Sequence, residues 1–330
     1  MPSNQSPLGA LPARFRRERL LIVGCGDIGQ RVLRDLHGGP GAGRVQLLAL
    51  SSSPSRVAQL RALGARPLRG DLDDVASLRR LSGLATRVLH LAPPPGAVDG
   101  GDARDPRTLA LTRVLRLRSL PRSLVYASTS GVYGDCAGAR VPETRALAPA
   151  TARAQRRAHA ERAVRHLGRA GVRVGILRVP GIYASDRARG RAEDRLRRGV
   201  PVPLPGDDVF TSHIHADDLA RVCVAALWRG RPQRAYNAGD SNPMKTGDYF
   251  DLVADRYGLP RPPRVPRSAL PPTLRSFIGE SRRLDNRRML RELGVRLRYP
   301  GVQQGLRGLS ALSAGSACPV CRSSGTHCSS

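Results

Sequence analysis

Short apolar runs alternate with amphipathic helical patterns along most of the chain. The first run, at 20–23, leads into glycines and then into a helical pattern with Ile28, Val32, Leu33 and Leu36 on one face. Similar apolar runs predict further strands at 45–50, 66–70, 86–92, 123–128, 172–179 and 234–240. Helical patterns predict helices at 56–64, 71–83, 106–118, 151–169, 213–230, 246–257 and 280–293.

Strands that alternate with helices predict right-handed βαβ units and an α/β fold. We therefore expect a Rossmann-type, doubly wound parallel sheet. Two Pro- and Gly-interrupted stretches leave this pattern and suggest a small cap built from non-contiguous segments. The expected division is an N-terminal tail at 1–18, a Rossmann domain at 19–184 and 211–240, a substrate cap at 185–210 and 241–308, and a disordered tail at 309–330.

The formal net charge of +29 is typical of a nucleic-acid-binding protein. However, Lys245 is the only lysine, and the arginines are spread through every segment. Aromatic residues for base stacking make up only 4% of the chain. We therefore expect loose attraction to anionic ligands and no specific nucleic-acid partner.

No apolar run reaches the length of a membrane span, and the Arg-rich first residues lack an apolar signal-peptide core. The cytoplasm is therefore the expected compartment, although a transit peptide is an alternative. Single, scattered cysteines fit a reducing compartment: Cys25, Cys136 and Cys223. The tail carries atoms suited to zinc, in Cys318, Cys321, His327 and Cys328. Free thiols in a disordered tail are favoured, and no metal site is predicted.

The pattern Gly24-x-Gly26-x-x-Gly29 lies between a predicted strand and a predicted helix. In this setting the first glycine permits a tight turn, the second leaves room for a pyrophosphate, and the third lets helix and strand pack closely. The helix N-terminus, with Asp27 and Ile28, would present free N–H groups to phosphates. Dinucleotide binding is therefore predicted, and the alternative is a glycine turn without a ligand.

The end of the second strand indicates which dinucleotide is bound. An NAD site usually has an acidic residue there, but no acid lies between Asp35 and Asp71. Ser51, Ser52 and Arg56 follow the strand instead and suit a 2′-phosphate. NADP is therefore favoured over NAD, although Arg56 could be only a solvated residue.

Two further strand ends are expected to contact the cofactor. Asp71 and Leu72 follow the third strand, where an adenine ring would lie, and a helix N-cap is the equal alternative for Asp71. Leu91, Ala92 and Pro93 end the fourth strand at the carboxyl edge, where open sheets bind their ligands.

Nine sequence blocks together resemble the short-chain dehydrogenase/reductase superfamily, in its extended and atypical branches. The blocks are "GCGDIG", "GDLDD", "HLAPPP", "YASTSGVYGD", "VPETRALAP", "ILRVPGIYA", "HIHADDLA", "YNAGD" and "ESRRLDNRRMLRELGVRLRYP". Within the superfamily the chain is similar to the NAD-dependent epimerase/dehydratase-type, nucleoside-diphosphate-sugar epimerase homologues. The resemblance covers about 19–308 and does not specify a substrate.

The resemblance assigns the substrate-side hydroxyl to Thr129, flanked by Ser128 and Ser130. It also implies a Tyr acid/base and a Lys four residues later, followed by a Glu after four more. Aligning that Glu with Glu161 puts Arg153 at the Tyr position and Arg157 at the Lys position. Arginine cannot shuttle a proton near neutral pH, although Arg157 could still bind a ribose. Proton transfer through another side chain is the alternative, the candidates being Tyr126, Tyr133, Tyr183 and His159.

The resemblance also places Arg178, Pro180, Gly181, Ile182 and Tyr183 beside the nicotinamide and the substrate. Arg282, Arg283 and Asn286 match a basic helix at the substrate mouth, where the arginines would suit an anionic group or form a solvated face. Two further pairs are expected to be structural. Asp217 or Asp218 would serve as a helix cap and packing anchor, and His213 and His215 should face opposite sides of an extended segment.

Three functions remain open at this point. The favoured function is an NAD(P)-dependent oxidoreductase or epimerase acting on a polar, anionic and perhaps nucleotide-linked small molecule. A dinucleotide-binding sensor or interaction protein with reduced turnover is the alternative, and a nucleic-acid binder is the weakest. A homodimer is a family expectation only.

Overall fold

A computed structural model describes residues 17–39, 42–96, 103–187, 190–271, 274–275 and 279–306. Nearly all of the predicted N-terminal tail and the whole of the predicted C-terminal tail lie outside these ranges. The possible zinc ligands of the C-terminal tail therefore lie there too.

Seven parallel strands form the central sheet, in the order β12-β7-β5-β4-β1-β2-β3. This arrangement confirms the predicted α/β, Rossmann-type parallel sheet. Most of these strands coincide with apolar runs of the sequence; β3 does not, and Leu68 is its only buried residue. Their bounds are β1 Glu18–Val23, β2 Val45–Ser51, β3 Arg66–Arg69, β4 Arg87–His90, β5 Ser123–Thr129, β7 Arg173–Val179 and β12 Arg234–Asn237.

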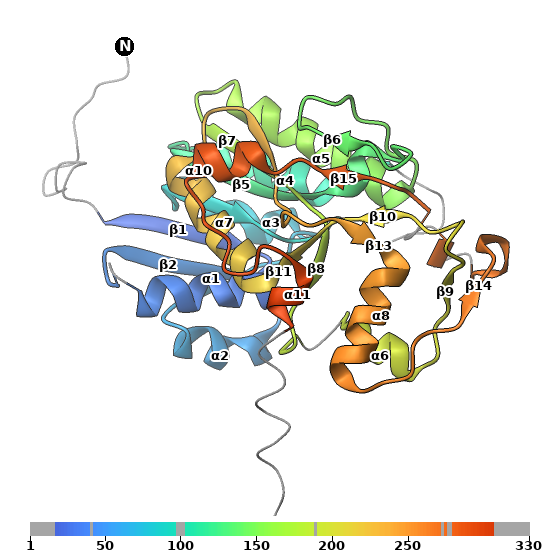
Figure 1. The fold of residues 1–330 in the computed structure, drawn as a ribbon. Helices are drawn as coiled ribbons and strands as arrows, with labels where there is room; N and C mark the ends of the chain where they lie inside the picture. Colours follow the sequence, from blue (N-terminus) through green and yellow to red (C-terminus); the bar gives the residue numbers. More distant parts are fainter. Residues whose placement is uncertain are drawn as a thin grey trace, which may run out of the picture.

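Helices cover both faces of the sheet (Figure 1). In β1, Leu20 and Ile22 pack into one apolar cluster, whereas Leu21 and Val23 pack into the other. This two-sided burial explains why the strands read as continuous apolar runs. One layer contains α1 Asp27–Gly38, α2 Val57–Ala62, α7 Ala216–Arg229 and α10 Arg287–Leu293; the other contains α3 Val75–Leu78, α4 Pro106–Leu115 and α5 Ala152–Gly168.

Elements from two separate stretches of the chain pack together beside the sheet, where Figure 1 shows α6, α8, β9 and β14. They share an apolar cluster that includes Leu196, Phe250 and Val253. These elements are α6 Ala192–Arg197, β9 Val202–Pro203, β10 Phe210–Thr211, β13 Met244–Lys245, α8 Thr246–Tyr257 and β14 Arg264–Val265. Between them and the sheet, β8 Gly181–Tyr183 pairs in parallel with β11 His213–His215.

The helix predicted at 280–293 is wrong in its first half. Residues 280–286 form no helix, and β15 Arg283–Leu284 pairs in parallel with β6 Arg140–Val141. Tertiary pairing overrides local helix propensity here, because the extended backbone donates hydrogen bonds to the β6 segment. The remaining short elements are α11 Val302–Gly305, η2 Pro54–Arg56, η3 Arg79–Leu81, η4 Ser130–Tyr133 and η5 Arg267–Ala269.

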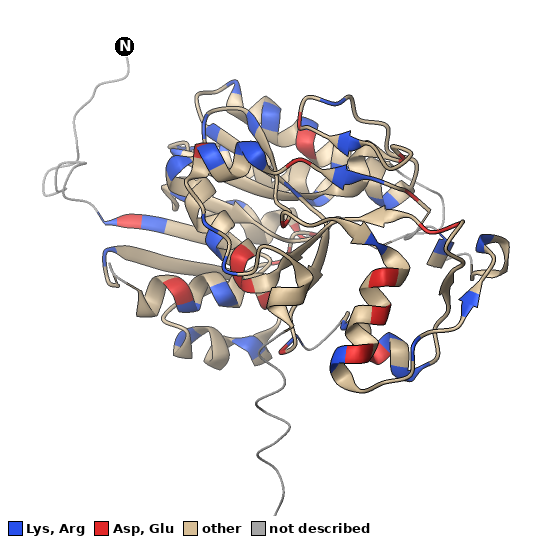
Figure 2. Cartoon of the chain, viewed as in Figure 1, with Lys and Arg blue, Asp and Glu red and all other residues tan. Residues whose placement is uncertain are grey.

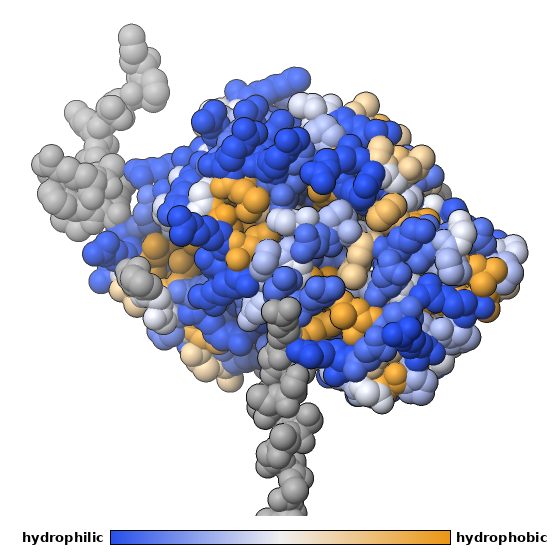
Figure 3. All heavy atoms as spheres, in the orientation of Figure 1, coloured by the Kyte–Doolittle hydropathy of each residue, from blue (hydrophilic) through white to orange (hydrophobic). Residues whose placement is uncertain are grey.

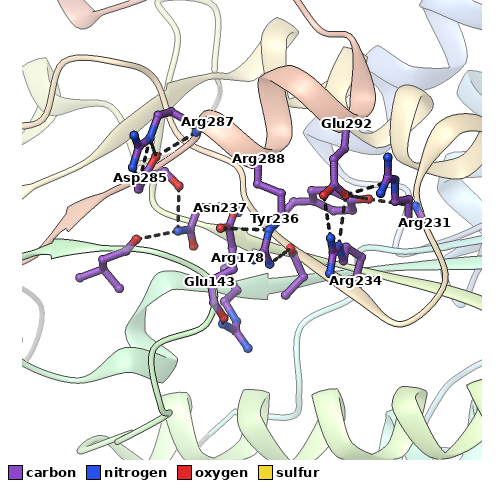
Figure 4. Close-up of polar contacts among 12 residues, drawn as sticks. Glu143, Arg178, Arg231, Arg234, Tyr236, Asn237, Asp285, Arg287, Arg288 and Glu292 are labelled. Carbon is purple, nitrogen blue, oxygen red and sulfur yellow. Dashed lines mark hydrogen bonds and ion pairs between the residues drawn. The ribbon is translucent and has the colours of Figure 1, made fainter.

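A buried polar network fixes this extended segment to the sheet (Figure 4). The Asn237 side chain donates to the backbone carbonyls of Val141 and Asp285, at 2.8 and 3.0 Å. The Tyr133 hydroxyl donates to Asn237 Oδ1 at 2.8 Å and accepts from Arg178 Nη1 at 2.8 Å. The network therefore links β7, β12 and the chain that leads into α10.

Basic side chains lie on nearly every element, and acidic ones also lie on several, α8 and α6 among them (Figure 2). On the same face, apolar residues form separated groups within a mainly hydrophilic surface (Figure 3). Within the described ranges, no helix is long and apolar enough to cross a membrane.

Candidate functional site

The glycine turn joins β1 to α1, and each of its three glycines has a different environment. Gly24 has φ +86°, and a Cβ there would lie 2.3 Å from the backbone nitrogen of Ala92. Gly26 precedes α1, and a Cβ on it would have no atom within 4 Å. A Cβ on Gly29 would lie 3.2 Å from Cys25 Sγ and 3.3 Å from Ile22 Cγ2, so only a glycine lets the helix pack this closely on the strand. The turn therefore leaves open space directly at the N-terminus of a 12-residue helix.

The neighbouring residues of the turn have structural partners. Asp27 accepts a hydrogen bond from Arg31 at 2.9 Å and pairs with Arg187 at 3.0 Å. Arg31 also pairs with Asp186 at 2.5 Å and with Asp217. Ile28 packs against the apolar cluster beneath α1. These contacts tie the turn to the chain after β8 and to α7.

A cavity of about 260 Å³ opens beside the turn, between the ends of β2 and β3. We call it the β2–β3 cavity. No acid stands at the end of β2, where Ser51 ends the strand. The lining of the β2–β3 cavity includes Gly24, Cys25, Ser51, Ser52, Ser53, Arg56, Asp71, Leu72, Asp73, Ala92 and Arg107.

Asp71 and Asp73 have different roles in this cavity. The alternative of an N-cap for Asp71 is wrong, because the α3 cap is Asp74, which accepts from the backbone nitrogen of Ala76 at 3.0 Å. Asp71 instead accepts from the backbone nitrogen of Asp73 at 3.0 Å. The Asp73 carboxylate pairs with Arg107 at 2.5 Å, and the hydrogen bond with Arg107 holds its pKa below the ordinary value.

The end of β4 contributes unequally to the cavity. Ala92 lines it, whereas Leu91 packs against the apolar core. The Pro93 carbonyl accepts a hydrogen bond from Arg107 at 3.4 Å.

The three hydroxyls after β5 point to different partners. Ser128 is buried and donates to Glu161 Oε1 at 2.7 Å. Thr129 Oγ1 accepts from the backbone nitrogen of Gly131 at 3.2 Å and so caps η4. Ser130 lines a second cavity. Thr129 is half-buried and directly precedes Ser130.

Residues four apart on α5 form one stripe that runs from the core to the surface. Glu161 is buried against Arg178, at 2.9 Å. Arg157 is half-buried and donates to the Ala127 carbonyl at 2.6 Å and to the Tyr126 hydroxyl at 3.2 Å. Arg153 is exposed at the outer end. Desolvation lowers its pKa, and the charge of Glu280 partly offsets that effect.

The alternative proton donors are engaged in other contacts. The Tyr126 hydroxyl accepts from Arg157, and burial raises the pKa of Tyr126 to about 12. Tyr133 is held between Arg178 and Asn237, and burial raises its pKa to about 12 as well. Tyr183 donates to the Gly301 carbonyl at 3.1 Å. His159 Nδ1 accepts from the backbone nitrogen of Asp105 at 3.1 Å.

The second cavity, of about 200 Å³, lies between β8, α6 and α8, and we call it the β8–α8 cavity. Arg195 reaches it with its guanidinium over the Phe250 ring, 4.6 Å from the centroid. Pro180 directly precedes the lining segment of β8. The lining includes Ser130, Gly181, Ile182, Arg195, Phe210, Thr211, Ser212, His213, Thr246, Tyr249, Glu280 and Arg282.

The two arginines expected at the substrate mouth are already paired. Arg282 lines the cavity, forms an ion pair with Glu280 at 2.5 Å and donates to the Gly134 carbonyl at 3.0 Å. Arg283 is not among the lining residues. It donates to the Gly138 carbonyl at 2.6 Å and lies over the Phe210 ring. They stand on the extended segment, not on the predicted helix.

The two histidines of β11 share a neighbour. His213 stacks on Tyr249 with centroids 4.2 Å apart, and burial lowers its pKa to about 4. His215 Nδ1 accepts from the backbone nitrogen of Asp217 at 3.3 Å and caps α7. Both rings contact Tyr183, despite their alternation along the strand.

The cap predicted for Asp217 or Asp218 is wrong, because His215 fills that role. The packing anchor predicted for the same pair is found at Asp218, which accepts from the backbone nitrogens of Arg298 and Tyr299 at 2.9 and 2.8 Å. Asn286 precedes α10 and donates to the Gly239 carbonyl at 3.0 Å. No group of three or more His, Cys, Asp or Glu side chains in the described residues could hold a metal ion.

Sequence reasoning missed Arg195, Tyr249 and Glu280 at the β8–α8 cavity. They come from three elements far apart in the chain. For Glu280 the only local signal in the sequence was an acidic residue beside several arginines. No such signal pointed to Arg195 or Tyr249.

Comparison with known proteins now defines the class to which this fold and site belong. A model of the NAD dependent epimerase/dehydratase family matches residues 20–239. The chain therefore belongs to the NAD-dependent epimerase/dehydratase family. No curated protein matches this sequence.

Solved structures agree with this fold. A functionally unknown conserved protein from Silicibacter pomeroyi DSS shares 32% identity, with a TM-score of 0.73, over 89% of this chain and 98% of its own. UDP-glucose 4-epimerase from Thermotoga maritima, with UDP-glucose, shares 21% identity (TM-score 0.72; 87% and 96% covered). UDP-glucose 4-epimerase from Thermus thermophilus, in complex with NAD, shares 23% identity (TM-score 0.70; 90% and 99% covered).

Proposed function

We propose that this protein binds a nicotinamide dinucleotide along the carboxyl edge of the sheet and a polar small molecule in the β8–α8 cavity. The observation that carries the proposal is the open space at Gly26. A side chain there would fill the cradle, and the N–H groups of α1 point into it. When bound, such a cofactor supplies hydride chemistry at its nicotinamide ring.

Substitution of Gly26 separates binding from folding. Gly26→Val fills free space without a clash, so the fold should persist while the affinity for NADPH and NADH falls at least about tenfold. Gly206→Val is the matched control, because Gly206 also has no atom within 4 Å of a Cβ but lies in an exposed loop. Fluorescence titration with both dinucleotides tests this, and unchanged affinity in Gly26→Val would contradict the proposal.

We further propose that NADP is preferred over NAD. Ser51 and Ser52 end β2 without a carboxylate, and Arg56 lines the same cavity. Arg107 pairs with Asp73 and so offsets one of the two acids there. A 2′-phosphate would therefore gain a charge-assisted contact without a facing carboxylate at the strand end.

The preference is testable at Arg56. NADPH should bind about tenfold more tightly than NADH, and Arg56→Gln should remove most of that ratio. Arg61→Gln, on the exposed side of α2, should leave it unchanged. Equal affinities in the wild-type protein would reject the NADP preference while leaving dinucleotide binding intact.

The reaction we propose is oxidoreduction or epimerisation at a hydroxyl or carbonyl of a nucleotide-sugar-type substrate. Thr129 is the hydroxyl group nearest in sequence to the cavity-lining Ser130. Arg153 and Arg157 occupy the positions at which the family resemblance expects Tyr and Lys. Arg157 can orient a ribose through its guanidinium, and Arg195 can attract an anionic group.

A second candidate is a dinucleotide-binding sensor with reduced turnover. The engaged hydroxyls of Tyr126, Tyr133 and Tyr183 support it. Incubation of the protein with NADP+ and UDP-glucose, followed by absorbance of the reduced cofactor, distinguishes the two. Slow reduction, or an epimerised sugar among the products, would support the enzyme, whereas tight cofactor binding with neither across a panel of nucleotide sugars would favour the sensor.

A further inference from the structure

Glu280 is the only acid among the described residues that line the β8–α8 cavity. Its side chain is 12% exposed. One carboxylate oxygen, Oε2, pairs with Arg282 at 2.5 Å. The other, Oε1, is buried and accepts no hydrogen bond from any described residue. Burial of a carboxylate oxygen without a hydrogen-bond donor is unfavourable, so Oε1 can accept a hydrogen bond from a bound molecule.

The described surroundings of Glu280 leave Oε1 without a hydrogen-bond donor. Arg282 lies on the same segment as Glu280. The negative charge of Glu280 also acts on Arg153 of α5, where it opposes the lowering of the arginine pKa by desolvation. Across the cavity, burial lowers the pKa of His213 to about 4, so this ring is neutral near pH 7. Arg195 stands on α6 over Phe250 and makes no ion pair within the described residues. The cavity therefore presents a cation on one wall and a hydrogen-bond acceptor on another.

We propose that Glu280 Oε1 accepts a hydrogen bond from a hydroxyl of the bound molecule and thereby selects a neutral sugar over a sugar acid. This inference rests on the proposed function, because it concerns the same cavity. A hydroxyl supplies the donor that Oε1 lacks. A ligand carboxylate supplies none near neutral pH and adds a second negative charge, while Arg282 is already paired.

Two probes differ only at the group that Glu280 would recognise. UDP-glucose carries a hydroxymethyl group where UDP-glucuronic acid carries a carboxylate. Isothermal titration of the full chain, with and without NADPH, should show UDP-glucose binding at least about tenfold more tightly. Glu280→Gln should bring the two affinities within about twofold of each other, because the amide can donate to a carboxylate.

Two further variants separate charge from folding. Glu280→Asp keeps the charge but retracts the oxygen, so it should keep the preference while binding UDP-glucose more weakly. Asp255→Asn removes the carboxylate of an exposed ion pair with Arg261 and should behave as wild type. Thermal denaturation and NADPH titration of each variant report whether the fold is intact.

Several results would overturn the inference. They are an unchanged preference in Glu280→Gln, identical behaviour of the Gln and Asp variants, equal binding of both probes by the wild-type protein, or binding of neither. If NADPH still binds in these cases, dinucleotide binding stands and only the inference about the substrate fails. If the wild-type protein does not bind NADPH, this result contradicts the proposed function itself.

Discussion

Gly24 meets two constraints that exclude every other residue type. Its φ of +86° lies in the left-handed region, and its α-carbon faces the backbone of Ala92 at the end of β4. The turn can therefore bring β1 close to β4 and still direct the chain into α1.

At this residue, Gly24→Ala should lower the free energy of unfolding by about 2–4 kcal/mol, because it adds both a clash and backbone strain. Gly171→Ala is the matched control, with φ +93° and no atom within 4 Å of its Cβ. It should cost only about 1–2 kcal/mol. Urea denaturation measures both, and equal losses would mean that the contact with Ala92 is unimportant.

Asp240 is a buried acid at the end of the β12 segment. Its Oδ2 has no hydrogen-bond partner in the described residues, and burial raises its pKa from 3.8 to about 8. The folded state therefore favours the protonated acid. The stability that this group contributes is complete below about pH 4 and is lost as the pH rises through about 8.

Asp240→Asn mimics the protonated acid and should remove this dependence. From pH 4 to pH 8, the variant should gain stability relative to wild type, by at most about 1.4 kcal/mol per pH unit. His213 titrates in both proteins, so its opposite contribution cancels in the difference. A pH-independent difference in urea midpoints would show that Asp240 is ionised in the folded protein.

At the scale of elements, α5 is attached to the sheet by a buried ion pair. Arg178 on β7 donates to both oxygens of Glu161, at 3.2 and 2.9 Å, and Ser128 on β5 donates to the same carboxylate. Burial alone would lower the pKa of Arg178, but the hydrogen bonds and charge of Glu161 outweigh it and raise the pKa. The helix that carries Arg153 and Arg157 is thereby fixed.

Glu161→Ala should lower the free energy of unfolding by about 3–5 kcal/mol, because it leaves Arg178 buried without a counter-charge. Asp255→Ala breaks an exposed ion pair and should cost no more than about 0.5 kcal/mol. Chemical denaturation of the two variants tests the difference. Similar small losses would show that Arg178 finds another partner.

At the scale of the whole molecule, the formal charge of +29 is a destabilising feature. Arginines and acids pair locally, as Arg31 does with three carboxylates, but most basic residues remain in excess. Mutual repulsion among them opposes the compact state.

Sodium chloride should therefore stabilise the protein by screening this repulsion. Between about 0.05 and 0.5 M salt the screening length falls from about 14 to about 4 Å, so the free energy of unfolding should rise by roughly 1 kcal/mol or more. The urea midpoint measures this rise, and a falling midpoint would show that salt weakens the native ion pairs more than it relieves repulsion. Parallel measurement without urea, by thermal unfolding, controls for denaturant effects.

The sequence by itself determined the sheet, its helical layers and the glycine turn. These features are local: apolar runs such as 20–23 record burial on both faces, and Gly24 and Gly26 stand at fixed positions between strand and helix. The family resemblance was also visible in the sequence, because the sequence blocks that carry it are local and many of them lie at strand ends.

Only the tertiary structure decided what surrounds the second cavity. Residues 280–286 were predicted to be helical, but β15 pairs with β6 there instead, and Glu280 and Arg282 line the cavity. The tertiary structure also paired both arginines that were expected to be available for a ligand. Such contacts join residues more than a hundred positions apart, and no local pattern of polarity records which of them will meet.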